Sequence, residues 1–252
     1  MKDYRPIIVT TFKELGSGPV DLLRRLGQLK PVVRRLLIEE ATSELSPPEQ
    51  LIEQAIMNHC KKEQLVNEEA LNGWLSEHFL TRDELILQVS LPLKLNKLAL
   101  DNFTPKAEAR FLRRKEELDQ STYSLLRVSD SGVAHELYLQ IEAGEAKFEA
   151  LAAQYSEGPE RSNGGKVGPA SLMNAHPILR QQLRSASPGE VLEPLLIEKW
   201  WVVSRLEESN KASFDEAMRQ RMATELLQEW ISEETNEVVK NIISSKNEND
   251  IT

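Results

Sequence analysis

The chain has a single cysteine, Cys60, among its 252 residues. An intramolecular disulfide needs two cysteines and cysteine-based zinc motifs need several, so both are excluded. Cys60 is expected to serve as a small apolar residue of a helix and not as a reactive thiol. Histidine is also scarce, and the four histidines have no metal-ligand spacing: His59, His78, His135 and His176. No metal site is therefore predicted.

Long apolar runs are missing as well. No stretch approaches the roughly 20 apolar residues that a membrane-spanning helix needs, so no membrane insertion is expected. Residues 1–15 contain neither the apolar core of a secretion signal nor a small-residue cleavage site. The expected location is therefore the cytoplasm.

Basic residues are in the minority, with 31 Lys and Arg against 40 Asp and Glu and a formal net charge of −9. Nucleic acids favour proteins with clustered Lys and Arg, so no nucleic-acid partner is expected. The glycine run at 164–168 lacks the Gly-Lys-Ser/Thr step of a phosphate-binding loop, and no Gly-x-Ser-x-Gly elbow occurs. This run is better interpreted as a tight loop that needs positive φ.

Helix signals dominate residues 1–119. Apolar residues recur there at intervals of three and four, which is the spacing of amphipathic helices. Thr81 and Glu84 have the spacing of a capping box and predict a helix start. That helix is expected to kink at Pro92, and the Thr-Pro pair at 104–105 predicts the start of a further helix.

From residue 120 the pattern changes to short strands and helices. The predicted elements are, in chain order, a strand at 123–128, helices near 133–142 and 145–155, a glycine-rich loop at 156–169, a helix near 177–185, and strands at 191–197 and 200–206. Trp200 and Trp201 are adjacent in the last strand, so we expect them to face opposite sides of a sheet. One is expected to be buried, and the other to be exposed or to line a groove.

The segment 209–244 returns to a helical pattern, with a capping box formed by Ser213 and Glu216. Its apolar face has no neighbour in sequence, so we expect this helix to pack back onto the N-terminal helices. The polar tail at 245–252 is predicted to be disordered. The predicted fold is α+β: an antiparallel sheet with surrounding helices at 120–208, inserted between the all-α N-terminal region and this long helix.

The inserted segment carries three motifs in a characteristic order. They are the pattern F-x-x-L-A-x-x-Y-S formed by Phe148, Leu151, Ala152, Tyr155 and Ser156, the run Gly-Gly-Lys-Val-Gly at 164–168, and the run Pro-Gly-Glu-Val at 188–191 followed by Pro194. With these motifs, the stretch from 121 to 208 resembles the parvulin family of peptidyl-prolyl isomerases. The helical flanks resemble those of the parvulin-containing chaperones and foldases of bacterial envelopes.

The resemblance implies where an active centre lies, and this chain departs from the family there. Ser124 stands where the first strand usually carries a histidine, and Trp201 stands where the last strand carries another. Gly158 replaces the usual Cys or Asp. The resemblance also implies a proline-ring pocket, formed here by Val167, Met173, Ala175 and Leu179. In that pocket Ala175 replaces a methionine and Leu179 a phenylalanine.

The implied function is a prolyl isomerase and folding factor that acts on unfolded or flexible polypeptides with X-Pro bonds, without any cofactor. Rotation about an amide breaks no bond and needs no nucleophile, so Ser124 could supply a hydrogen-bond donor and Trp201 a pocket wall. Since the usual polar groups are replaced, weak activity or none is predicted. The alternative is an inactive parvulin-fold chaperone, or a protein that binds one dedicated client.

Overall fold

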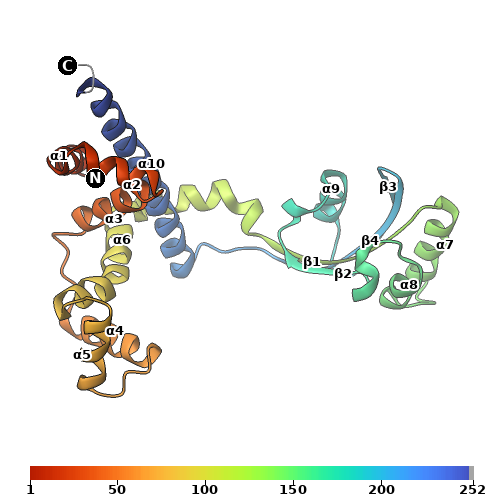
Figure 1. The fold of residues 1–252 in the computed structure, drawn as a ribbon. Helices are drawn as coiled ribbons and strands as arrows, with labels where there is room; N and C mark the ends of the chain where they lie inside the picture. Colours follow the sequence, from red (N-terminus) through yellow and green to blue (C-terminus); the bar gives the residue numbers. More distant parts are fainter. Residues whose placement is uncertain (250–252) are drawn as a thin grey trace. The chain divides into compact units, whose positions relative to one another are not determined.

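The structure is a computed structural model that describes residues 1–249, with side chains to residue 244. The chain divides into two compact units, drawn in Figure 1. The helical unit consists of Met1–Arg110 together with Asp215–Thr252, and the sheet unit is Phe111–Phe214. The sheet unit thus contains the predicted segment 120–208. No helix among the described residues has the length and hydrophobicity that crossing a membrane requires.

All elements of regular secondary structure in the described part of the helical unit are α-helices. They are α1 (Arg5–Leu15), α2 (Ser17–Arg25), α3 (Leu29–Ala41), α4 (Glu49–Lys62), α5 (Glu68–Glu77), α6 (Arg82–Leu118, which continues into the sheet unit) and α10 (Glu216–Asn249). Apolar residues of α1, α2, α3, α6 and α10 share one core, in which Val33, Leu227 and Ile231 are fully buried. The prediction that the last helix packs back onto the N-terminal helices is therefore confirmed. Of the predicted disordered tail, residues 245–249 belong to α10 and residues 250–252 lie outside the described part.

The helix starts and breaks were predicted with mixed success. The capping box at Thr81 is confirmed, since its backbone N–H donates to the Glu84 carboxylate at 2.7 Å. The predicted new start at 104–105 is wrong, because α6 runs through Pro105 as well as Pro92. The kink at Pro92 stays a prediction, since a helix can bend at a proline without ending there. A proline removes only one helical hydrogen bond, and tertiary packing of the rest can outweigh that loss. At the start of α10 the cap is Asp215 and not Ser213, since Asp215 accepts from the backbone of Met218 at 2.8 Å.

The sheet unit has the predicted α+β composition. Its elements are β1 (Gln120–Val128), α7 (Ser131–Glu142), α8 (Phe148–Tyr155), the 3-10 turn η1 (Pro159–Asn163), β2 (Lys166–Ala170), the 3-10 turn η2 (Leu172–Asn174), α9 (Pro177–Ser185), β3 (Val191–Ile197) and β4 (Trp200–Asn210). The four strands form an antiparallel sheet in the order β2-β1-β4-β3. Strand β2 lies in the segment that was predicted to be a loop. Its glycines and proline hid the strand pattern.

The two faces of this sheet pack against different helices, as Figure 1 shows. We call them the α7–α8 face and the α9 face. On the α7–α8 face, Leu126 and Val203 pack against buried residues of α7 and α8. On the α9 face, Leu125 and Val202 pack against Leu179 and other residues of α9. Because side chains alternate along a strand, neighbouring residues of β1 and β4 belong to opposite faces.

Candidate functional site

Three of the four residues predicted to hold a proline ring meet on the α9 face. Leu179 is buried in the apolar cluster of this face, and Val167 and Ala175 are half-buried against it. They come from three different elements, namely α9, β2 and the segment that follows η2. Val167 is the cross-strand partner of Tyr123, so the Tyr123 side chain stands beside the group.

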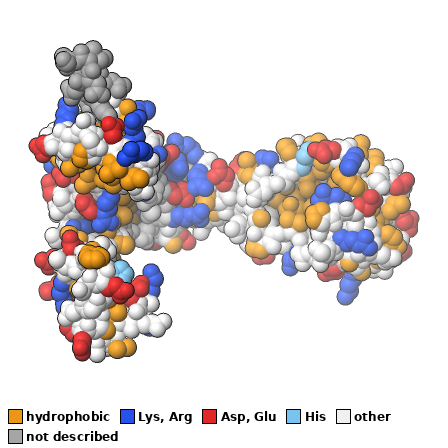
Figure 2. Space-filling view, viewed as in Figure 1, with side chains coloured by type: hydrophobic (Ala, Val, Ile, Leu, Met, Phe, Trp, Pro, Cys, Tyr) orange, Lys and Arg blue, Asp and Glu red, His pale blue; other side chains and the backbone are white. Residues whose placement is uncertain are grey.

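Met173, the fourth predicted pocket residue, is more exposed than the other three. Its side chain is 39% exposed, and its sulfur accepts a hydrogen bond from Arg180 Nη1 at 3.1 Å. Arg180 also donates to the Ala175 carbonyl at 3.4 Å, so this arginine holds the chain before α9 in place. Figure 2 shows hydrophobic side chains gathered at the surface of α9 and the segment before it. The accessible apolar surface there includes Met173 and Ile178.

Ser124 faces the opposite side of the sheet. It is buried on the α7–α8 face, and its hydroxyl donates to the Glu207 carboxylate at 2.5 Å. Arg205 donates to the same carboxylate oxygen at 2.8 Å and lies 5.3 Å from the centre of the Phe148 ring. The hydroxyl of Ser124 is therefore committed to an internal network.

The paired tryptophans face opposite sides, as predicted, but the prediction that one of them is buried is wrong, because both are half-buried. Trp201 belongs to the α7–α8 face, with its ring 5.9 Å from that of His135. Trp200 belongs to the α9 face, and Lys199 Nζ lies 5.1 Å from its ring centre. The structure thus brings Ser124 and Trp201 to one face and the Val167 group to the other. It does not unite the five residues in one site.

Gly158 adjoins a buried ion pair. Arg127 donates to both oxygens of Glu160 at 2.9 and 2.8 Å, in bidentate geometry, and the Glu160 side chain is only 4% exposed. A Cβ placed on Gly158 would lie 2.4 Å from Arg127 Nε and 2.3 Å from a Glu160 oxygen. The ion pair therefore occupies the space that a Cys or Asp side chain would take at this position.

Ser156 completes this polar centre. Its hydroxyl donates to Glu160 at 2.7 Å and accepts from the backbone N–H of Arg127 at 3.1 Å. The two residues of the ion pair were missed by the sequence reasoning, although one signal was present. Arg127 occupies an alternating position of β1 shared with Tyr123 and Leu125, and an arginine on a core-facing position needs a buried partner.

Tyr123 is a second residue that the sequence reasoning missed. It is buried on the α9 face, and among the described residues none hydrogen-bonds its hydroxyl. Burial raises the pKa of Tyr123, the negative charge of Glu160 raises it further, and the positive charge of Arg127 opposes both. The phenol therefore stays protonated at neutral pH and remains a hydrogen-bond donor.

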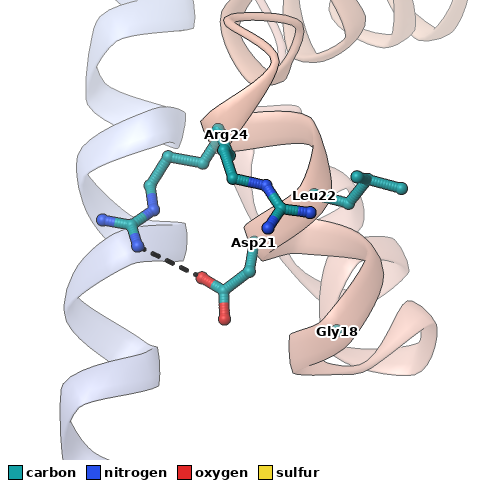
Figure 3. A pocket seen from close by; sticks show the side chains of 5 residues that line it. Gly18, Asp21, Leu22 and Arg24 are labelled. Carbon is teal, nitrogen blue, oxygen red and sulfur yellow. Dashed lines mark hydrogen bonds and ion pairs between the residues drawn. The ribbon is translucent and has the colours of Figure 1, made fainter.

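A hollow of about 530 Å³ lies on α2 of the helical unit, far along the chain from these residues. Figure 3 shows its lining, in which Arg24 and Asp21 form an ion pair at 3.4 Å. Its lining residues all come from this one helix, namely Gly18, Asp21, Leu22, Arg24 and Arg25. It is a shallow surface groove, and it offers no group of buried polar atoms for a ligand.

Comparisons with known proteins identify the sheet unit. The PPIC-type PPIase domain of the Rotamase family matches residues 130–208. The protein named Chaperone SurA of Shewanella oneidensis is 36% identical over 104 residues, which make up 37% of this chain and 24% of that protein. Chaperone SurA of Colwellia psychrerythraea is 32% identical over 88 residues, or 35% and 20% of the two chains. The chain thus spans a quarter or less of the length of these relatives.

Two solved structures are similar over more of the chain. The peptidylprolyl isomerase PrsA of Bacillus cereus has a TM-score of 0.47 and 16% identity, over 88% of this chain and 84% of that chain. PrsA of Bacillus subtilis has a TM-score of 0.34 and 20% identity, over 89% and 85%. Both TM-scores are below 0.5, so the domain is identified by the family match and not by these structures.

Proposed function

Because residues 130–208 belong to the PPIC-type family of peptidyl-prolyl isomerases, we propose that the chain binds X-Pro segments of unfolded polypeptides and speeds their isomerisation. The binding surface is the α9 face, where Val167, Ala175 and Leu179 form an apolar group. The observation that carries the proposal is the position of this group beside Tyr123, on the face of β1 to which Arg127 also belongs by strand alternation. Apolar and polar groups converge there as they do in binding sites for small cyclic groups.

Catalysis of this isomerisation requires few functional groups. The barrier to rotation about a peptide bond is about 18–20 kcal/mol and comes from amide resonance. Any surface that binds the twisted amide more tightly than either planar isomer lowers this barrier. An apolar group that holds the ring and a donor next to the amide together meet the requirement. The Ala175 and Leu179 side chains are smaller than the methionine and phenylalanine usual in the family, so the grip on the ring and the acceleration are expected to be weak.

The charges of this surface favour neutral segments over phosphorylated ones. Arg127 is neutralised by Glu160, and the loop from 129 to 132 carries the acidic Asp130, which caps α7 by accepting from the Val133 N–H at 2.9 Å. A phosphate needs a cluster of uncompensated cations. We expect phospho-Ser-Pro peptides to bind no better than unphosphorylated ones. A preference of about tenfold for the phosphopeptide, which is the gain from one or two charge-assisted hydrogen bonds, would contradict this.

The whole chain is proposed to act as a chaperone, in keeping with the names of its relatives. The helical unit exposes large apolar side chains near α4, α5 and the start of α6, among them Met57, Val66 and Phe79, the last 93% exposed. Suppression of aggregation of a proline-free client tests this holding role separately from isomerisation. A dedicated client and the cytoplasmic location remain predictions, and fractionation of cells that express the full-length gene product tests the location.

The isomerase proposal is tested by NMR exchange spectroscopy on a panel of X-Pro peptides with the full chain. Ala175→Asp places a charge in the apolar group at a half-buried position, so peptide binding and acceleration are both expected to fall about tenfold or more. Leu179→Asp tests the same group at a buried position, with circular dichroism to check folding. Leu139→Asp is the matched control, since Leu139 is an exposed residue of α7.

Two outcomes would contradict the proposal in different ways. If the wild-type protein shifts peptide resonances but leaves exchange unchanged, the domain is a binding module without catalysis. If Ala175→Asp and Leu139→Asp both leave binding and exchange at the wild-type level, the α9 face is not the binding surface.

A further inference from the structure

We infer that the Tyr123 hydroxyl is the catalytic hydrogen-bond donor of this domain, and that the Arg127–Glu160 pair positions the bound segment beside it. This inference rests on the proposed isomerase function and assigns its polar groups. None of the three family positions, at 124, 158 and 201, supplies such a group on the α9 face. Ser124 and Trp201 belong to the opposite face, and Gly158 has no side chain.

The reaction calls for a donor aimed at the prolyl nitrogen. In the planar amide this nitrogen shares its lone pair with the carbonyl and is a poor acceptor. As the amide twists, the lone pair returns to the nitrogen, which can then accept a hydrogen bond. A donor at this place therefore stabilises the twisted form selectively and accelerates rotation. No bond to carbon or nitrogen forms or breaks, and no proton has to be transferred.

Tyr123 meets this requirement by its position. It stands directly opposite Val167 across the β1–β2 ladder and belongs to the same apolar cluster as Leu179. Its hydroxyl has no hydrogen-bond partner among the described residues, whereas the hydroxyl of Ser124, one residue along the strand, is held by Glu207. Ser204 of β4 presents a second unpartnered hydroxyl to this face, but its side chain is fully buried, so the phenol is the hydroxyl assigned to the bound segment.

The Arg127–Glu160 ion pair lies on the same face of β1, with Arg127 four residues along the strand from Tyr123. Glu160 engages Nε and Nη2 of Arg127, and the third nitrogen, Nη1, donates no hydrogen bond to any described residue. The Arg127 side chain is 31% exposed, so this nitrogen has access to a bound chain. Because the pair carries no net charge, it is suited to hold a neutral peptide carbonyl. The absence of a side chain at Gly158 leaves the space in which the pair lies.

The test compares three variants of the full chain by NMR exchange spectroscopy on one X-Pro peptide, with binding measured by titration. Tyr123→Phe removes only the hydroxyl, so acceleration is expected to fall about tenfold, the effect of one hydrogen bond, while the Kd changes less than about twofold. Ser124→Ala is expected to retain the wild-type rate. Tyr138→Phe is the matched tyrosine control, since its hydroxyl donates to Glu142 on the same helix, α7.

The outcomes separate this inference from the function on which it rests. Acceleration that survives Tyr123→Phe, or that Ser124→Ala reduces equally, would overturn the assignment and leave the isomerase proposal standing. A wild-type protein that does not accelerate exchange would overturn both. A loss in Tyr123→Phe that comes wholly from weaker binding would assign the hydroxyl to substrate binding and refute its role as the catalytic donor.

Discussion

The two faces of the sheet hold similar polar groups in different states. On each face a hydroxyl of β1 accompanies an Arg–Glu pair: Ser124, Arg205 and Glu207 on the α7–α8 face, and Tyr123, Arg127 and Glu160 on the α9 face. On the first face the hydroxyl is bonded to the carboxylate of the pair. On the second face the hydroxyl is left without a partner, and the carboxylate is bonded to Ser156 instead.

Burial separates the two faces further. The Glu160 side chain is 4% exposed, whereas that of Glu207 is 26% exposed. Neighbouring residues of one strand thus lie in different surroundings, so an active centre cannot be transferred by alignment without checking which face each residue occupies.

The largest effect is expected from breaking the buried pair. Glu160→Ala removes a buried carboxylate that accepts two hydrogen bonds from Arg127 and one from Ser156, and we expect the free energy of unfolding to fall by about 2–4 kcal/mol. The matched change on the other face, Glu207→Ala, removes a more exposed pair and one serine hydrogen bond, and is expected to cost about 1–2 kcal/mol. Urea denaturation of both variants measures the difference. Equal losses would show that the two pairs are alike in energy and would remove the contrast.

A smaller effect is expected from restoring the family residue at position 158. In Gly158→Cys the new Cβ falls within 2.4 Å of both members of the pair, so the pair must move. We expect a cost of about 1–3 kcal/mol, typical of overpacking, and no gain in isomerase activity. Gly158→Ala adds the methyl group alone and separates crowding from thiol chemistry. A stable and more active Gly158→Cys protein would show that the pair has room to yield.

The smallest effect concerns pH and again distinguishes the faces. The pKa of Tyr123 is raised in the folded state, chiefly by burial, so folding favours its protonated form. Its contribution to stability is complete below the unfolded pKa of about 10 and is lost as the pH rises through the folded pKa. As the pH is raised above about 10, the free energy of unfolding is therefore expected to fall less in Tyr123→Phe than in the wild type. Denaturation at a series of pH values measures this difference. A parallel loss in both proteins would mean that the phenol ionises freely.

The order of the helices and strands could largely be predicted from the sequence. The predictions failed where the structure depends on tertiary contacts. The helix at 177–185 and the opposite orientations of Trp200 and Trp201 follow from local capping and strand alternation, and both were found. The continuity of α6 through Pro105, where a new helix was predicted to start, depends on packing that no local pattern contains. So does strand β2, which is defined by its pairing with β1.

The site was predictable only in its apolar part. Val167 and Leu179 could be placed because the motif positions carry apolar residues that share one cluster. Tyr123 and Glu160 could not, because the resemblance directs attention to Ser124 and Gly158. The partnership of Arg127 with Glu160 joins residues 33 positions apart in the chain. Pairing at that distance is fixed by the fold and leaves no periodic trace in the sequence.

The return of α10 to the N-terminal helices also has a consequence for biosynthesis. Val33 and Leu37 share their core with Leu227, Ile231 and Val238, which the ribosome adds about 200 residues later. At roughly 5–20 residues per second this interval is on the order of 10–40 seconds, during which the first helices lack the partner that completes their core. The sheet unit is synthesised in full within the interval. The domain that is proposed to assist other chains can therefore be folded before the scaffold that carries it is closed.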